Sequence, residues 1–268
     1  MSDVERIGSS QNATVKRVRQ LISSRKARNE EQSFVIEGLN SVEMLLTDQQ
    51  SRIKAEVLMI SESLAESDAG QDLFERAQGM RRLILQDELM ARIQDVRNGP
   101  GVLAIAQIPP APPLPGEGGG KYILLDNLSD PGNMGTIIRS AAGLGIDGIL
   151  LYGRCVDIYN PKCVRSTAGM LAFIDLVEVK EKDVVRLVEK AYTLVLAEAG
   201  GGTALARWAP AERTIVAIGS EAHGISPELR AVSSDTLRIG LAPFCESLNA
   251  AVAAGIIMSA MSPFREQD

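Results

Sequence analysis

Polar, glycine-rich segments follow three apolar stretches in the second half of the chain. They read DNLSDPGNMG from residue 126, GSEAHGIS from residue 219 and APFCESLN from residue 242. Arg, Asn, Ser and Glu side chains in such segments can hold a substrate by hydrogen bonds and stabilise charge that develops on it. In open parallel α/β sheets, ligands bind beyond the carboxyl ends of the strands. We therefore expect these three segments to form the functional site.

Several familiar kinds of site do not fit these residues. DPGNMGTI lacks the GxGxxG pattern of a dinucleotide-binding turn, and the chain has neither the G-K-[ST] of a phosphate-binding loop nor the GxSxG of a serine hydrolase. One histidine, His223, and three cysteines without paired spacing offer no set of metal ligands. We expect no metal site, reduced thiols and no histidine base held by a carboxylate.

Composition places the chain among ordinary globular proteins. Its 268 residues are 45% hydrophobic and 23% charged, which predicts two modest domains. A net charge of -6 argues against indiscriminate coating of nucleic acid. The sequence has no apolar run of membrane-spanning length, and its first residues lack the apolar core of a signal peptide. We expect a cytoplasmic protein that does not enter a membrane.

A proline- and glycine-rich segment divides the chain. PPAPPLPGEGGGK shows no hydrophobic periodicity, so residues 109–120 are predicted to be an exposed linker between domains at 1–108 and 121–268. The second domain alternates apolar strands with helices, among them helices at about 134–144 and 247–261 and a strand TLRIGL. Strands that are apolar throughout predict a parallel sheet buried on both faces.

The first domain carries the chain's one strongly basic run. Apolar residues at helical spacing predict a helix near its start, and SFVIEG, AEVLMIS and GVLAIAQI predict strands of a small α/β domain. Charges in such a run contact RNA phosphates or simply form a solvated helix face. The candidate RNA-binding residues are Lys16, Arg17, Arg19, Arg25, Lys26 and Arg28.

Three ordered motifs resemble one enzyme family. NLSDPGNMGTIIR at Asn127–Arg139, IGSEAHGI at Ile218–Ile225 and IGLAPFCESLNAAVA at Ile239–Ala253 are similar to the motifs of the SpoU (TrmH-like) RNA ribose 2'-O-methyltransferases of the SPOUT superfamily. The segment at 160–173 fits the family between its first two motifs. The N-terminal pattern resembles the family's substrate-binding domain, a small module similar to a ribosomal-protein fold. The resemblance covers almost the whole chain outside the linker.

The resemblance implies a fold, a cofactor and partners. It implies a C-terminal domain with a deep trefoil knot, S-adenosylmethionine as the methyl donor, structured RNA as the substrate and a homodimer formed through the C-terminal domain. By position, Gly219, Ile239 and Leu248 match the family's cofactor-contacting sites. Glycine at 219 is expected to let the backbone approach the ligand.

The catalytic residues implied by the resemblance are Asn133, Arg139, Glu221, Ser247 and Asn249. A guanidinium stays protonated in proteins, so our hypothesis is that Arg139 holds the phosphate beside the target ribose and stabilises developing alkoxide charge. Asn133 and Asn249 would hold the arginine or the ribose, although Asn is also typical of turns. Ser247 is equally typical of a helix N-cap.

The third motif departs from the family pattern. The family usually reads Ile-Pro-Met followed by a glycine, whereas this chain has Gly240 in place of the proline and Pro243 in place of the glycine. The exchange changes local stiffness, and hence the geometry of the loop.

Together these observations favour ribose methylation of ribosomal RNA. Transfer RNA is the alternative substrate. A non-catalytic RNA-binding or ribosome-assembly factor is an alternative of another class. A dinucleotide-dependent oxidoreductase is disfavoured, because the glycines of the first segment do not follow the GxGxxG pattern.

Overall fold

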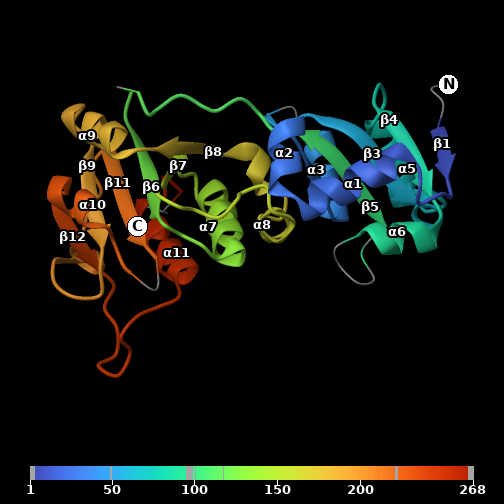
Figure 1. Cartoon of the computed structure of the whole chain (residues 1–268). Helices are drawn as coiled ribbons and strands as arrows, with labels where there is room; N and C mark the ends of the chain where they lie inside the picture. The colour runs from blue at the N-terminus through green and yellow to red at the C-terminus, as the bar shows by residue number, and fades with distance from the viewer. Residues whose placement is uncertain are drawn as a thin grey trace. The chain divides into compact units, whose positions relative to one another are not determined.

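The computed structural model describes residues 4–48, 50–94, 99, 101–116, 118–220 and 223–264. The chain forms two compact units (Figure 1). Unit 1 holds Met1–Pro110 and Asp157–Phe173, and unit 2 holds Ala111–Val156 and Ile174–Asp268. No helix among the described residues is long and apolar enough to cross a lipid bilayer.

Unit 1 contains a mixed five-stranded sheet in the order β1-β4-β3-β5-β2. The strands β1, β4 and β3 are parallel, whereas β5 and β2 run antiparallel to their neighbours. The strands are β1 (Val4–Ile7), β2 (Ser33–Glu37), β3 (Ala55–Ser61), β4 (Arg81–Leu85) and β5 (Val102–Gln107), and the helices of its first segment are α1 (Ala13–Ser23), α2 (Arg25–Glu31), α3 (Leu39–Thr47), α4 (Glu62–Ala65), α5 (Asp68–Arg76) and α6 (Asp87–Ile93).

Helix α1 covers one face of this sheet. Asn12 caps it, with its side chain accepting from the Thr14 amide at 2.8 Å. Val15, Val18 and Leu21 then point to one side and join a core with α6 and alternate residues of the strands. The apolar spacing predicted this helix correctly, because the pattern of buried residues is the pattern of the sequence.

Unit 1 also takes in a segment that we expected in the second domain. Residues 157–173, with α8 (Pro161–Ser166) and a 3-10 turn at Met170–Phe173, pack on β2 and α3. The Tyr159 ring lies 4.7 Å from that of Phe34, centroid to centroid, and Asp157 pairs with Arg28. Chain order alone does not reveal this, since the segment lies between two strands of the other unit.

Unit 2 contains a seven-stranded sheet in the order β10-β12-β9-β11-β6-β7-β8. Every pairing in it is parallel, which confirms the predicted parallel sheet. The strands are β6 (Gly120–Asp126), β7 (Gly148–Tyr152), β8 (Asp175–Val179), β9 (Thr193–Ala197), β10 (Thr203–Ala204), β11 (Arg213–Gly219) and β12 (Asp235–Arg238), and the helices are α7 (Pro131–Gly143), α9 (Glu181–Glu189), α10 (Pro227–Val232) and α11 (Ala250–Met261), with a 3-10 turn at Leu205–Arg207.

Both faces of this sheet are covered. Val184 and Leu187 of α9 and Leu229 of α10 pack on alternate strand residues of one face. Side chains alternate along a strand, so neighbours such as Ile123 and Leu125 belong to the other face, where α11 packs on α7, β6 and β11. In Figure 1, α7 and α11 lie side by side.

Three boundaries in unit 2 differ from the expectation. Helix α7 begins at Pro131, because Asp130 caps it and proline suits the first helical position. Helix α11 begins at Ala250 with Asn249 as its cap, so Ser247 is not the N-cap. Strand β12 ends at Arg238, which leaves Ile239 outside the sheet.

The second half of the predicted linker is only partly exposed, because some of its residues contact unit 2. Pro115 is buried and Leu114 packs against the core of unit 2. The Tyr192 hydroxyl donates to the carbonyls of Gly116 and Gly119, at 3.0 and 2.9 Å. These contacts fix the segment that leads into β6.

Candidate functional site

The first polar segment forms a rigid exit from β6. Asp126 is fully buried, and its carboxylate accepts from the Ser226 amide and the Asn127 side chain, each at 2.6 Å. Asn127 takes a left-handed backbone (φ 55°), and its side-chain oxygen accepts from the Arg154 amide at 2.8 Å. Asp130 then accepts from the Asn133 amide at 2.7 Å at the start of α7. The Asp and Asn residues of this segment thus shape the turn that orients α7.

The second segment folds back on itself directly after β11. The Gly224 amide donates to the Ser220 carbonyl at 2.8 Å, and Gly224 takes a left-handed backbone (φ 65°). A Cβ on Gly219 would lie 2.2 Å from the Gly224 carbonyl carbon and 2.6 Å from the Ile225 nitrogen. Glycine is therefore required at 219 by the returning chain, a reason that adds to the close ligand approach predicted for this position. Glu221 lies outside the described residues.

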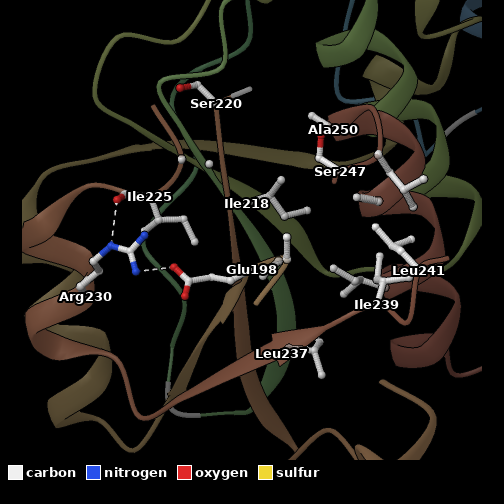
Figure 2. A pocket seen from close by; sticks show the side chains of 17 residues that line it. Glu198, Ile218, Ser220, Ile225, Arg230, Leu237, Ile239, Leu241, Ser247 and Ala250 are labelled. Carbon is white, nitrogen blue, oxygen red and sulfur yellow. Dashed lines mark hydrogen bonds and ion pairs between the residues drawn. The ribbon is translucent and has the colours of Figure 1, made fainter. Parts of the chain in front are cut away.

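A cavity of about 320 Å³ lies beside the segment that follows β11 (Figure 2). Gly219, Ile239 and Leu248, the three predicted cofactor residues, all line it, together with Ser247. They come from β11 and from the segment between β12 and α11, which runs without helix or strand from 239 to 249. Much of the remaining wall is apolar and consists of Ile218, Ile225, Leu237, Leu241 and Ile257.

One charged pair in this cavity was not predicted from the sequence. Glu198 and Arg230 both line the cavity and form an ion pair. The Arg230 Nε also donates to the Ile225 carbonyl at 3.2 Å, as Figure 2 shows. Glu198 follows β9 and Arg230 lies on α10, outside all three motifs. The available signal was position alone: Glu198 is a polar residue just beyond the carboxyl end of a central strand.

Asn133 and Asn249 contact each other. The Asn249 amide nitrogen donates to the Asn133 side-chain oxygen at 3.0 Å, while its own oxygen accepts from the Ala251 and Val252 amides at 2.9 and 3.3 Å. The cap bonds identify which end of the Asn249 amide is the oxygen. The pair joins the start of α7 to the start of α11, and so joins the first motif to the third.

Two catalytic candidates remain, Ser247 and Arg139, and only Ser247 lines the cavity. Arg139 is exposed on α7, six residues beyond Asn133, and is not part of the cavity wall that the structure describes. Ser247 is exposed at the rim of the cavity, and its carbonyl accepts from the Cys245 thiol at 3.3 Å. Within one chain, the structure brings the cofactor residues and Ser247 together and leaves Arg139 apart from them.

The thiol beside the first segment is poorly suited to nucleophilic chemistry. Cys155 donates to the carbonyls of Leu125 and Tyr152, at 3.3 and 3.4 Å. Burial is the main cause that raises the pKa of the Cys155 thiol, which disfavours the reactive thiolate. Among the described residues, no cluster of three or more His, Cys, Asp or Glu side chains is placed to hold a metal ion.

The basic run of unit 1 divides into side chains that are exposed and side chains that are held by ion pairs inside the fold. Lys16, Arg19, Arg25 and Lys26 are exposed. Arg17 is half-buried and bonded to Glu31 at 2.6 Å and Glu56 at 3.1 Å.

The prediction that Arg28 contacts RNA is wrong, because its side chain is buried and paired. Its side chain is only 4% exposed and pairs with Asp157 at 2.6 Å while donating to the Leu21 and Ile22 carbonyls. A guanidinium whose donors are used inside the fold is not available to a phosphate on the surface. Arg28 is therefore a structural residue of unit 1.

Comparison with known proteins assigns both halves of the chain. A family model described as the SpoU rRNA Methylase family matches residues 120–259, and one described as the MRM3-like substrate binding domain matches residues 12–104. An uncharacterised tRNA/rRNA methyltransferase of Synechocystis sp. is 31% identical, over 96% of this chain and 93% of its own length. A Bacillus subtilis 23S rRNA (guanosine(2553)-2'-O)-methyltransferase is 28% identical, over 95% of this chain and 98% of its own.

Solved structures agree with this assignment. The crystal structure of an AdoMet-bound rRNA methyltransferase from Sinorhizobium meliloti superposes with a TM-score of 0.81 at 28% identity, covering 95% of this chain and 96% of that chain. A SpoU methyltransferase from Streptomyces viridochromogenes, in complex with AdoMet, gives 0.79 at 26% identity, covering 92% and 96%. The resemblance seen in the three motifs is confirmed, and the chain belongs to the SpoU rRNA methylase family.

Proposed function

We propose that this chain is an S-adenosylmethionine-dependent methyltransferase that methylates a ribose 2'-hydroxyl of ribosomal RNA. The observation that carries the proposal is the cavity of unit 2, where Gly219, Ile239, Ser247 and Leu248 come together from two motifs far apart in the sequence. Relatives named as 23S rRNA 2'-O-methyltransferases cover nearly the whole chain.

The cavity fits the cofactor. Its volume of about 320 Å³ lies within the range of roughly 300–1,000 Å³ for small-molecule sites. Ile218, Ile239 and Leu248 offer apolar walls to an adenine ring, and backbone groups of residues 239–248 are outside helix and sheet hydrogen bonding. Glu198 supplies a carboxylate that can accept from ribose hydroxyls or an ammonium group. When bound, S-adenosylmethionine supplies an electrophilic methyl group on a sulfonium.

The chain's own residues then have to align a weak nucleophile and stabilise its charge. Ser247 at the rim of the cavity can donate or accept a hydrogen bond at the incoming ribose. Arg139 holds the phosphate beside that ribose and stabilises alkoxide charge as the hydroxyl proton leaves to phosphate or water. The Asn133–Asn249 hydrogen bond fixes the helix that carries Arg139. Most of the acceleration in this scheme comes from alignment.

A homodimer through unit 2 would complete the site. Val252 and Ile256 leave apolar side chains 52% and 38% exposed on α11, the helix that packs on α7. Arg139 is exposed on α7 and does not line the cavity described in its own chain. A second copy packed on this α7–α11 surface would bring its Arg139 to the cavity of the first.

The proposal includes the family's trefoil knot and its RNA-recognition domain. The last helix, α11, returns from the edge strands to pack on α7 and on the central strands β6 and β11, as a threaded C-terminal segment must. Unit 1, for which the resemblance implies a ribosomal-protein-like α/β fold, presents the exposed Lys16, Arg19, Arg25 and Lys26 to RNA phosphates. Arg25 and Lys26 stand in the first turn of α2, where a cation is unfavourable to the helix by about 0.3–1 kcal/mol. A role in binding would account for that cost.

The test is transfer of labelled methyl from S-adenosylmethionine to purified ribosomal RNA and, in parallel, to transfer RNA. We expect label on ribosomal RNA. Label on transfer RNA alone would favour the alternative that the tRNA/rRNA names of several relatives leave open. Cofactor binding without label on either RNA would point to ribosome-assembly intermediates as substrates, and absence of cofactor binding would favour a non-catalytic RNA-binding factor.

A further inference from the structure

The segment between β12 and α11 carries an aromatic side chain that the proposed function does not use. Ile239 and Leu241 at its beginning and Ser247 and Leu248 at its end line the cavity, while its middle does not. Figure 1 shows this segment extending away from the sheet as a long loop. Phe244, near the middle of that loop, is 91% exposed.

A tight turn holds Phe244 at the tip of the loop. The Cys245 amide donates to the Ala242 carbonyl at 2.9 Å, which closes a four-residue turn with Pro243 and Phe244 at its centre. Proline fixes φ near −65°, the value that the second position of such a turn requires. The Cys245 thiol donates to the Ser247 carbonyl at 3.3 Å and ties the turn to the rim of the cavity. The ring is therefore presented in a restricted range of positions.

Folding does not explain this placement. Burying a phenylalanine side chain stabilises a protein by about 1.5–3 kcal/mol, which Phe34 in the core of unit 1 provides and Phe244 does not. The chain has five phenylalanines in 268 residues, so a fully displayed ring is not a consequence of abundance. Pro243, which stiffens the turn, is also one of the two departures from the usual motif. These features are typical of a contact residue.

We propose that Phe244 stacks on a nucleobase of the RNA, at the target nucleotide or next to it. This inference rests on the proposed function. A ribose that reaches the cavity passes Ser247, and Phe244 is three residues from Ser247, at most about 11 Å along an extended chain. Bases of single-stranded RNA are commonly recognised by stacking on aromatic side chains.

Charge favours a base over a phosphate as the contact. Residues 239–249 contain no lysine or arginine and one acid, Glu246, so the loop itself offers nothing to neutralise a phosphate. Stacking on a ring is also tolerant of base identity, since every base has a π face. The predicted contribution is thus to affinity and placement of the nucleotide, with little dependence on salt.

The first experiment compares Phe244→Ala with the wild-type protein in steady-state methyl transfer to ribosomal RNA. Loss of one stacked base should raise the KM for RNA about 5- to 150-fold, by the same factor at low and high salt, with the KM for S-adenosylmethionine unchanged. Phe244→Tyr and Phe244→Trp should restore most of the affinity, because they keep the ring. Phe264→Ala removes a ring that is 71% exposed elsewhere in unit 2 and serves as the matched control.

A binding measurement makes the test independent of turnover. The chain has one tryptophan, Trp208, so Phe244→Trp in a Trp208→Phe background places the only fluorophore of that type on the loop. RNA should quench its emission, and S-adenosylmethionine alone should leave it unchanged. Quenching without methyl transfer would retain the stacking role while rejecting the proposed activity.

Three results would overturn the inference. The first is an unchanged KM for RNA in Phe244→Ala. The second is unchanged emission of the tryptophan variant under conditions where RNA binding is seen by gel shift. The third is conversion of Phe244→Ala to a monomer in sedimentation, which would assign the ring to contact with a second copy of the chain.

Discussion

At the scale of single residues, Gly219 is tightly constrained by the backbone around it. Its Cβ would collide with backbone atoms of Gly224 and Ile225, which cannot move aside as a flexible side chain could. Gly219→Ala should therefore push the returning segment into the cavity and weaken S-adenosylmethionine binding tenfold or more, measured by isothermal titration calorimetry.

Gly240→Ala provides the control for that substitution. A Cβ on Gly240 would meet no heavy atom within 4 Å, and Gly240 is outside the described cavity wall. We expect wild-type cofactor affinity from it. Equal affinities for the Gly219 and Gly240 variants would contradict the role assigned to the close approach at Gly219.

Arg139 tests the proposed chemistry. Removal of one donor that stabilises transition-state charge commonly lowers kcat about 10²- to 10³-fold. We expect Arg139→Ala to lose activity to that extent while cofactor affinity, measured calorimetrically, stays unchanged. Arg139→Lys keeps the charge and loses the planar fork, so full activity of the lysine variant would reject any role for the fork.

The sequence was enough to predict which residues form the motifs. It was not enough to predict how those residues are arranged in space. Sequence indicated Gly219, Ile239, Ser247 and Leu248, and the structure gathers them in one cavity. Glu198 and Arg230 were missed because they stand outside the motifs and are joined only by the fold. Arg28 was misassigned, since a sequence does not show that Asp157, 129 residues away, will neutralise it.

At the scale of elements, Asn249 links two helices. It caps α11 and donates to Asn133 on α7. Loss of a cap costs about 0.5–2 kcal/mol, and loss of a hydrogen bond about 0.5–1.5 kcal/mol. Asn249→Ala should lower the free energy of unfolding by about 1–3 kcal/mol, measured by urea denaturation of the cofactor-free protein.

The aspartate variant separates the two effects. Asn249→Asp retains the cap oxygen and loses the donor to Asn133, so it should keep most of the stability and still lose activity. An aspartate variant with wild-type turnover would show that the link between α7 and α11 does not matter for the reaction.

The buried ion pair of unit 1 gives a second prediction for an element. Arg28 and Asp157 are 4% and 12% exposed, and Arg28 joins α2 to the segment that contains α8. Breaking a buried pair by removing one partner costs about 3–5 kcal/mol. Arg28→Ala should therefore destabilise unit 1 by that amount and raise hydrogen exchange in residues 157–173.

Lys26→Ala is the comparison for this pair. Its ion pair with Glu30 is exposed and long, at 3.7 Å, and such pairs contribute about 0–1 kcal/mol. Lys26→Ala should leave stability nearly unchanged and weaken RNA binding instead. Similar destabilisation by both substitutions would contradict the division of the basic run into structural and exposed charges.

Periodicity accounts for which elements were foreseeable. The strongly apolar strands β6, β7, β9 and β11 and the amphipathic α1 follow directly from the spacing of apolar residues. The short β1 and β10 were missed, because four or two residues are too few to show a period.

GLGIDG at 143–148 matches the GxGxxG pattern of a dinucleotide-binding turn. The segment runs from the end of α7 into β7, however, which is the reverse of the strand-to-helix order that such a site needs.

At the scale of the whole molecule, the exposed apolar side of α11 predicts a dimer. Replacing Val252 and Ile256 together by Asp places two charges on that surface and should give a monomer in sedimentation velocity. The monomer should lose methyl transfer, because Arg139 would no longer reach a second cavity. A fully active monomer would reject the shared site.

Complementation tests the same idea without disrupting the surface. Arg139→Ala and Leu248→Arg, each inactive alone, should recover activity when mixed as heterodimers, since one cavity would then meet an intact Arg139. Continued inactivity of verified heterodimers would place Arg139 at the cavity of its own chain.

The most direct measurement of the central claim is the position of the transferred methyl group. Ribosomal RNA methylated by the wild-type protein would be hydrolysed with alkali and its labelled products separated. A 2'-O-methyl group blocks cleavage at that ribose, so the account predicts label in one alkali-resistant dinucleotide, formed about 10²- to 10³-fold more slowly with Arg139→Ala. Label recovered in mononucleotides, as a methylated base would give, would contradict the assignment of the ribose 2'-hydroxyl as the methyl acceptor.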